Sequence, residues 1–296
     1  MASEQATMQF GVLLPTREAV MSRWRDPAPI YQMAERAEEL GFHSVWVGDS
    51  LTARPRVEAL ATLAAVGART RRVRLGTSIF LAALRQPVML AYQLASVDWL
   101  AGGRVDLGIG YGRPNDGAHE LEYRHVGITA ENRIKRSEEI VTVLRRLWRE
   151  PVVDFSGRFH RVDRAGILPR PHGDIPIWFG GFTPAAITRA ARIGDGFLFG
   201  AASRPMQALC EALGKALDAA GRPRKGFGVE TVVSYADGPE RWRSAAETWR
   251  KLGATHFSMR AMNTGAALMG EQPPGFTTPR QHIDALEPFI RAVRGV

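Results

Sequence analysis

Cysteine is almost absent from this chain of 296 residues, which contains only Cys210. A single cysteine excludes an internal disulfide and every zinc site built on cysteine pairs. Cys210 falls within a helical apolar pattern, so we interpret it as an ordinary helix residue. No metal site is predicted.

Long apolar runs are also missing, because no segment approaches 18 consecutive apolar residues. No membrane-spanning helix is therefore expected. Residues 1–8 are polar and lack a charged stretch followed by an apolar one, so no secretory signal is predicted and we expect a soluble, cytoplasmic protein. A hydrophobic share of 45% argues against disorder.

Positive charge dominates, with a formal net charge of +9. Such a balance can indicate a nucleic-acid partner, but the arginines are scattered along the chain. The nearest approach to a run is Arg69, Arg71, Arg72 and Arg74. We interpret most of this charge as solvated surface whose field attracts anionic ligands, and we predict no nucleic-acid partner.

Short apolar runs alternate with amphipathic patterns along the chain. The runs predict strands at 8–14, 44–47, 73–79, 104–109, 175–179, 196–199, 229–235 and 256–259. Helical patterns follow at 30–40, 57–68, 86–100, 134–148, 184–193, 205–220, 242–252 and 286–293, and a hairpin is predicted at 152–162.

Eight such pairs predict an α/β fold, a closed (β/α)8 TIM barrel that uses residues 1–296 as one domain. Insertion loops are expected after strand four, at 110–129, and after strand eight, at 262–278. An open doubly wound sheet is the alternative. It is disfavoured because no Gly-x-Gly-x-x-Gly turn opens the first strand–helix unit.

Active sites of such barrels lie at the carboxyl ends of the strands. Here these ends are rich in glycine and poor in titratable side chains. Neither metal ligands nor a carboxylate pair is evident, which argues against a hydrolase. Two interpretations stay open: the glycines admit a large flat cofactor, or they only form turns.

The segment Gly180-Gly181-Phe182-Thr183-Pro184 joins a predicted strand to a predicted helix. Thr183 suits the N-cap and Pro184 the first helical position. Free backbone N–H groups at such an end can bind phosphate. The alternative is an ordinary helix cap.

Several motifs, taken in order, resemble the bacterial luciferase-like monooxygenase superfamily of flavin- and coenzyme F-420-dependent oxidoreductases. They are Leu75-Gly76-Thr77-Ser78-Ile79, Gln86-Pro87, the stretch 102–110, Pro176-Ile177-Trp178 and Gly194-Asp195-Gly196-Phe197. The resemblance runs from the first strand to about residue 200 and continues weakly to the last strand.

The resemblance implies a TIM barrel, usually a homodimer, that uses the deazaflavin F-420 or FMN for hydride transfer or monooxygenation of a small organic substrate. FMN would be reduced by a separate flavin reductase. A cis peptide would fall at Ser78-Ile79, against the cofactor ring. Cofactor contacts are expected from Thr77, Ser78, Ile79, Gly110, Tyr111, Gly180, Gly181, Thr183, Ser203 and Arg204.

The chain also departs from the family pattern. Deazaflavin dehydrogenases of this superfamily often carry Ser-Asp-His after strand two, where this chain has Gly48-Asp49-Ser50. The Thr77-Ser78-Ile79 motif resembles the deazaflavin branch, and the basic charge suits that cofactor's acidic tail; FMN is the alternative. Bacterial luciferase has an arginine for the FMN phosphate where this chain has Tyr111.

Candidate catalytic side chains are Asp49, Tyr111, His119 and His125. Histidine titrates near neutral pH and is therefore the natural proton donor. Because the histidine of the dehydrogenases is missing, a non-catalytic flavin-binding or carrier homologue is the alternative function.

Overall fold

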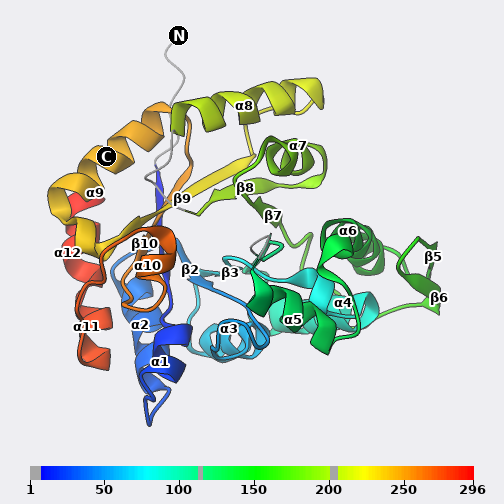
Figure 1. Ribbon diagram of the computed structural model, residues 1–296, viewed down its shortest axis with the longest axis horizontal. Helices are drawn as coiled ribbons and strands as arrows, with labels where there is room; N and C mark the ends of the chain where they lie inside the picture. The colour runs from blue at the N-terminus through cyan, green and yellow to red at the C-terminus, as the bar shows by residue number, and fades with distance from the viewer. Residues whose placement is uncertain (1–7, 113–115, 201–205) are drawn as a thin grey trace.

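The computed structural model describes residues 8–112, 116–200 and 206–296. Eight parallel strands close into a barrel at its centre (Figure 1). In order around the barrel they are β1 (Gln9–Leu13), β2 (Ser44–Val47), β3 (Arg74–Thr77), β4 (Val105–Ile109), β7 (Ile177–Gly180), β8 (Gly196–Phe199), β9 (Gly228–Ser234) and β10 (His256–Arg260). The predicted (β/α)8 barrel is confirmed.

Helices surround the strands (Figure 1). Those that follow the barrel strands in turn are α2 (Ala28–Glu39), α3 (Ala59–Arg69), α4 (Pro87–Leu100), α6 (Arg133–Arg149), α7 (Pro184–Ile193), α8 (Met206–Ala219), α9 (Pro239–Lys251) and α12 (Leu286–Val293). Shorter elements are α1 (Thr16–Met21), η1 (Ala82–Leu84), α5 (Gly117–His125), η2 (Ala130–Asn132), η3 (Tyr235–Asp237), α10 (Ala266–Met269) and α11 (Pro279–Asp284).

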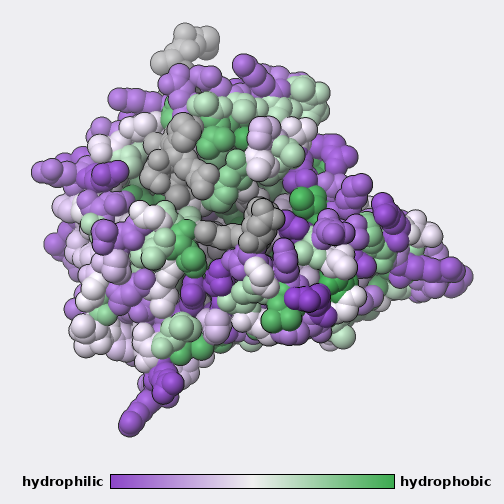
Figure 2. Space-filling view, viewed as in Figure 1, coloured by the Kyte–Doolittle hydropathy of each residue, from purple (hydrophilic) through white to green (hydrophobic). Residues whose placement is uncertain are grey.

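The predicted hairpin is present as β5 (Val153–Ser156) paired antiparallel with β6 (Arg161–Ala165). It projects from one side of the molecule, and its tip is hydrophilic (Figures 1 and 2). The Glu139 carboxylate accepts hydrogen bonds from the backbone N–H groups of Arg158, Phe159 and His160. The turn is therefore held to α6.

One prediction was wrong in detail, because the segment after β4 is not a plain loop but contains α5. Asp116 caps this helix by accepting hydrogen bonds from the N–H groups of Ala118 and His119. The helix has few apolar residues, and two of its three buried side chains are His119 and Glu122. A search for apolar periodicity therefore misses it.

The barrel interior is filled largely by Trp46 and Trp178, whose rings lie edge to face with centroids 6.0 Å apart. Glycine faces each ring: a Cβ on Gly76 would lie 2.1 Å from Trp46, and one on Gly228 would lie 1.9 Å from Trp178. Gly11 and Gly196 make room for the same two rings. These four glycines in the barrel strands therefore leave the space that the two indole rings fill.

A polar group is buried beside these rings. The Glu230 carboxyl is fully buried and accepts a hydrogen bond from the Ser258 hydroxyl. Burial raises the pKa of Glu230 to about 8, since the charged form loses its hydration. The side chain is therefore mainly neutral at pH 7.

Glu230→Gln should stabilise the protein increasingly as pH rises. In the unfolded chain the carboxyl loses its proton near its ordinary pKa of 4.5, whereas the folded protein keeps it up to about 8. Wild-type stability therefore falls across that window, at up to about 1.4 kcal/mol per pH unit, and the neutral amide removes this loss. Urea unfolding at about pH 5 and about pH 8 measures the difference. An equal effect of the substitution at both pH values would show that Glu230 is ionised in the fold.

Candidate functional site

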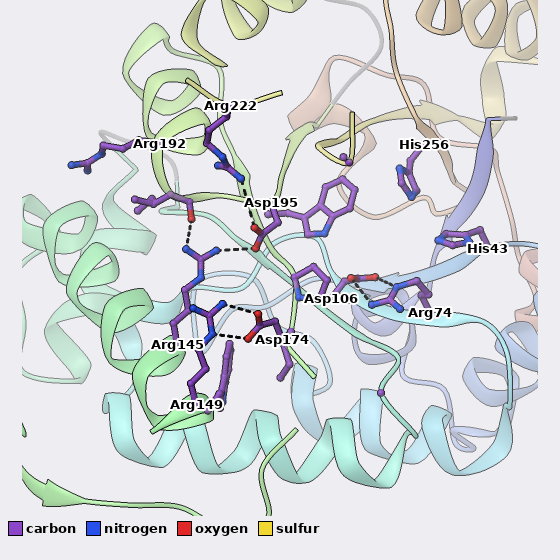
Figure 3. Close-up of a pocket in the computed structure, with 18 residues that line it drawn as sticks. His43, Arg74, Asp106, Arg145, Arg149, Asp174, Arg192, Asp195, Arg222 and His256 are labelled. Carbon is purple, nitrogen blue, oxygen red and sulfur yellow. Dashed lines mark hydrogen bonds and ion pairs between the residues drawn. The ribbon is translucent and has the colours of Figure 1, made fainter. Parts of the chain in front are cut away.

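A cavity of about 580 Å³ lies at the amino ends of the strands, opposite the end where barrel active sites lie (Figure 3). His43 precedes β2, and Arg74 and His256 begin β3 and β10. The arginines that line this cavity already have carboxylate partners: Arg145 contacts Asp195 at 2.8 Å, and Arg149 contacts Asp174 at 2.6 Å. Burial lowers the pKa of His43 to about 4 and that of His256 to about 3, so both rings are neutral.

At the carboxyl end, β3 stops at Thr77 and the Ser78–Ile79 peptide bond is cis, as the family resemblance implied. The Ile79 side chain lies over Gly110 and Gly180, where added Cβ atoms would stand 2.4 and 2.9 Å from it. These two glycines were predicted to contact a cofactor, but they face the Ile79 side chain. They shape the mouth of the barrel by leaving the space that Ile79 fills.

Asp49 fixes this corner of the mouth. Its carboxylate accepts hydrogen bonds from the Leu81 N–H at 2.9 Å and from both terminal nitrogens of Arg85, at 2.5 and 2.8 Å. Its own N–H donates to the Ile79 carbonyl at 3.1 Å. The side chain is 1% exposed. Asp49 therefore ties the end of β2 to the bulge that follows β3.

The Thr77 hydroxyl makes a similar connection on the other side of β3. It donates to the Gly108 carbonyl at 3.0 Å and lies 2.9 Å from the Gly108 N–H, which donates to it. Pairing between β3 and β4 ends just before this point, at Gly76 and Asp106. Thr77 thus extends the connection between the two strands to the edge of the mouth.

The β7–α7 turn is built as its sequence predicted. The Thr183 hydroxyl accepts a hydrogen bond from the Ala186 N–H at 3.2 Å, and Pro184 begins the helix. The Thr183 side chain is exposed, and Gly181 precedes it at the rim. The start of α7 is therefore open to a ligand. Ser203 and Arg204, predicted as neighbours of this turn, lie outside the described residues.

Tyr111 lies between β4 and α7. The Arg189 guanidinium is 5.1 Å from its ring centroid, and Arg189 also donates to Glu138 at 2.7 Å. The Tyr111 hydroxyl is buried and has no hydrogen-bond partner of good geometry among the described residues. Burial raises the pKa of this hydroxyl, so it stays protonated and can donate.

Helix α5 is fastened to the loop that follows β2. The Glu122 carboxylate accepts hydrogen bonds from the Ser50 hydroxyl at 2.7 Å and from the Thr52 N–H at 2.8 Å. Arg54 pairs with Asp116 at 2.5 Å. No local sequence pattern indicates this anchoring role for Glu122, because its partners lie about 70 residues earlier.

The two histidines of α5 differ in their surroundings. The His119 side chain is 11% exposed, packs near Gly112 and has its Nδ1 3.3 Å from the Asp116 carboxylate. His125 is exposed and lies 3.2 Å from the Thr52 hydroxyl. Of the two, only His119 combines burial with a neighbouring carboxylate.

Two arginines that sequence reasoning assigned to the surface, Arg17 and Arg56, are half-buried near the same mouth. Arg56 lies against Gly48, and the segment that carries it is bonded to α1 through Val57 N–H and the Thr16 carbonyl. The only signal in the sequence is the segment Arg54-Pro55-Arg56 in the loop that follows β2.

These features suit a flat redox cofactor with an anionic tail. The buried Tyr111 hydroxyl has no hydrogen-bond partner of good geometry among the described residues, and the positive end of the α7 dipole is exposed where β7 ends. Among the described residues, no group of three or more His, Cys, Asp or Glu side chains is arranged to hold a metal ion. None of the helices within these same ranges is long and apolar enough to cross a membrane.

The luciferase-like monooxygenase family model matches residues 8–284 of the chain. The chain is 32% identical to the F420-dependent glucose-6-phosphate dehydrogenase of Nakamurella multipartita over 76% of this chain and 69% of the relative. It is 31% identical to the enzyme of the same name from Kineococcus radiotolerans, over 77% and 70%.

Solved structures share the fold. The monooxygenase RslO1 from Streptomyces bottropensis superposes with a TM-score of 0.80 at 23% identity, over 97% of this chain and 99% of that one. An F420-dependent secondary alcohol dehydrogenase gives a TM-score of 0.74 at 21% identity over the same shares. With the match to the family model, these findings show that the chain belongs to the luciferase-like monooxygenase family and is an oxidoreductase.

Proposed function

We propose that this protein is an F420-dependent oxidoreductase that transfers hydride between the deazaflavin and a small organic substrate. The observation that carries the proposal is the mouth of the barrel, where the Ser78–Ile79 bulge lies against Gly180 at the end of β7, just before α7 begins. Its relatives named as F420-dependent enzymes support the choice of cofactor. The alternative cofactor is FMN, reduced by a separate reductase. The fluorescence titration described below distinguishes FMN from F420.

The cofactor would be held by groups already positioned for it. Ser78 and Ile79 would contact the ring, with Thr77 buried behind them, while Gly181 and Thr183 would bind the phosphate with the Tyr111 hydroxyl. The sequence adds Ser203 and Arg204 to this set. The bound deazaflavin would supply the carbon that gives or accepts hydride.

For the proton that accompanies hydride transfer, we propose His119. Its side chain is 11% exposed, it belongs to α5, which follows β4, and its Nδ1 lies 3.3 Å from the Asp116 carboxylate. Asp49 acts as a positioning residue, because Leu81 and Arg85 occupy its carboxylate. Tyr111 serves the phosphate, and His125 faces solvent.

We also propose a homodimer formed through α4. This helix is apolar on all sides, and its outer face leaves Met89, Tyr92, Trp99 and Leu100 between 46% and 62% exposed. Large exposed apolar side chains gathered on one face mark protein interfaces. A two-fold axis would let the same face cover itself.

Thr183→Val should weaken F420 binding about tenfold, because the hydroxyl and the cap that it forms would be lost from the phosphate site. Thr188→Val, one turn further along α7 and also exposed, is the matched control and should bind normally. Fluorescence titration with F420 and with FMN gives both affinities. Binding of FMN alone would assign the monooxygenase alternative, and binding of neither would remove the oxidoreductase proposal.

His119→Gln should lower kcat by a factor of about 10²–10⁴ with little change in F420 affinity, because a positioned proton donor is removed. His125→Gln should stay within about twofold of the wild type. Both are measured by following F420 absorbance with a panel of alcohols and aldehydes. A larger effect at His125 would contradict the assignment, and no turnover with normal F420 binding would favour the carrier alternative.

Trp99→Glu should convert a dimer into a monomer in sedimentation velocity, since a charge at the centre of an apolar interface loses its hydration. Leu168→Glu is the control, because Leu168 is 79% exposed and lies outside α4. A monomeric wild-type protein, or dissociation by the control alone, would place the interface elsewhere or remove it.

A further inference from the structure

Most arginines at the mouth of the barrel have a carboxylate partner. Arg54 pairs with Asp116, Arg85 with Asp49, and Arg260 with Glu271. Arg17 and Arg56 are different, since neither contacts a carboxylate within the part of the chain that the structure describes. The guanidinium groups of these two side chains are therefore without a carboxylate in contact among the described residues.

Arg56 places its guanidinium at the end of β2. A Cβ on Gly48 would lie 1.8 Å from Arg56 Nη1 and 3.7 Å from the Ser78 carbonyl oxygen. Its Nε donates to the Arg54 carbonyl at 3.1 Å, which fixes the orientation of the group. The terminal nitrogens are left beside the bulge where the ring is proposed to bind.

Arg17 reaches the same wall from α1, which follows β1. The Val57 N–H donates to the Thr16 carbonyl at 3.3 Å, so the backbones that carry the two arginines are joined. Arg17 Nε is buried with no hydrogen-bond partner among the described residues. Two guanidinium groups thus converge at the ends of β1 and β2.

Such an arrangement is unfavourable without an anion. Burying a charge without a partner is costly, and two neighbouring cations also repel each other. Burial and the nearby Arg17 lower the pKa of Arg56 to about 10, against the opposite effect of Asp49 and Glu122. Burial and Arg54 lower the pKa of Arg17, against the opposite effect of Glu18. A carboxylate or phosphate between the two would reverse both effects and form charge-assisted hydrogen bonds.

We propose that Arg17 and Arg56 form a binding site for a carboxylate or phosphate group of the substrate, at the mouth beside the Ser78–Ile79 bulge. This inference rests on the proposed function for the identity of the reaction, and it names the class of substrate: a small organic molecule that carries an anionic group. The arginines bind and orient that group.

The cofactor's own acidic tail is the other source of such an anion, and the barrel order argues against it. The proposed phosphate site follows β7, which is four strands from β1 in the ring of eight. Arg17, after β1, therefore lies opposite the start of α7, and Arg56, after β2, lies three strands away from it. A cofactor ring between the arginines and α7 would have its acidic tail on the α7 side and the substrate on the arginine side.

The test is calorimetric titration of inorganic phosphate into protein saturated with F420. The wild type should bind, and Arg17→Gln and Arg56→Gln should each bind at least tenfold more weakly. Arg25→Gln is the matched control, because Arg25 is exposed in the loop after α1, and it should bind like the wild type. Thermal unfolding checks that the variants fold; loss of an unpaired buried cation should leave Tm unchanged or raise it.

F420 affinity, measured in the same variants, separates the two sources. Unchanged F420 affinity with lost phosphate binding supports a substrate site. A tenfold loss of F420 affinity in Arg17→Gln or Arg56→Gln assigns the arginines to the tail and overturns the inference, as does equal phosphate binding by all variants or none by the wild type. If F420 itself does not bind, the proposed function fails, whereas the same phosphate titration on the protein without F420 still tests the arginine site.

Discussion

The packing of Trp46 and Trp178 inside the barrel is the constraint on which the rest of the structure depends. Two indole rings fill the space that branched aliphatic side chains occupy in most barrels of this kind. They fit because Gly76 and Gly228 remove the side chains that would otherwise meet them. Above this layer, Gly110 and Gly180 admit Ile79 in the same way, so the shape of the mouth follows from the packing beneath it.

Alternation of apolar runs and amphipathic patterns predicted the eight barrel strands, because each strand is mostly buried and carries a short run of mainly apolar residues. The Thr183 cap was equally predictable, since the pair Thr-Pro at a strand–helix junction encodes it locally. The position of the cis peptide came from the family resemblance, and the structure places it there.

The rest depends on contacts between distant segments, which no local pattern reports. The glycines at the carboxyl ends of the strands were interpreted as room for a cofactor or as turns, whereas Gly76 faces Trp46, and Gly110 and Gly180 face Ile79. The sequence predicts Asp49 as a candidate for acid–base chemistry, but its carboxylate is bound by Arg85, which lies 36 residues later. Arginines that are unremarkable in the sequence become a pair only when α1 and the loop after β2 are brought together.

The anchoring of α5 through Glu122 has a mechanical consequence. One carboxylate holds the Ser50 hydroxyl and the backbone N–H groups of Leu51, Thr52 and Ala53, so helix and loop form a single stiff body. His119 travels on the helix and Arg54 on the loop. These bonds therefore keep the proposed proton donor at a fixed distance from the loop that follows β2.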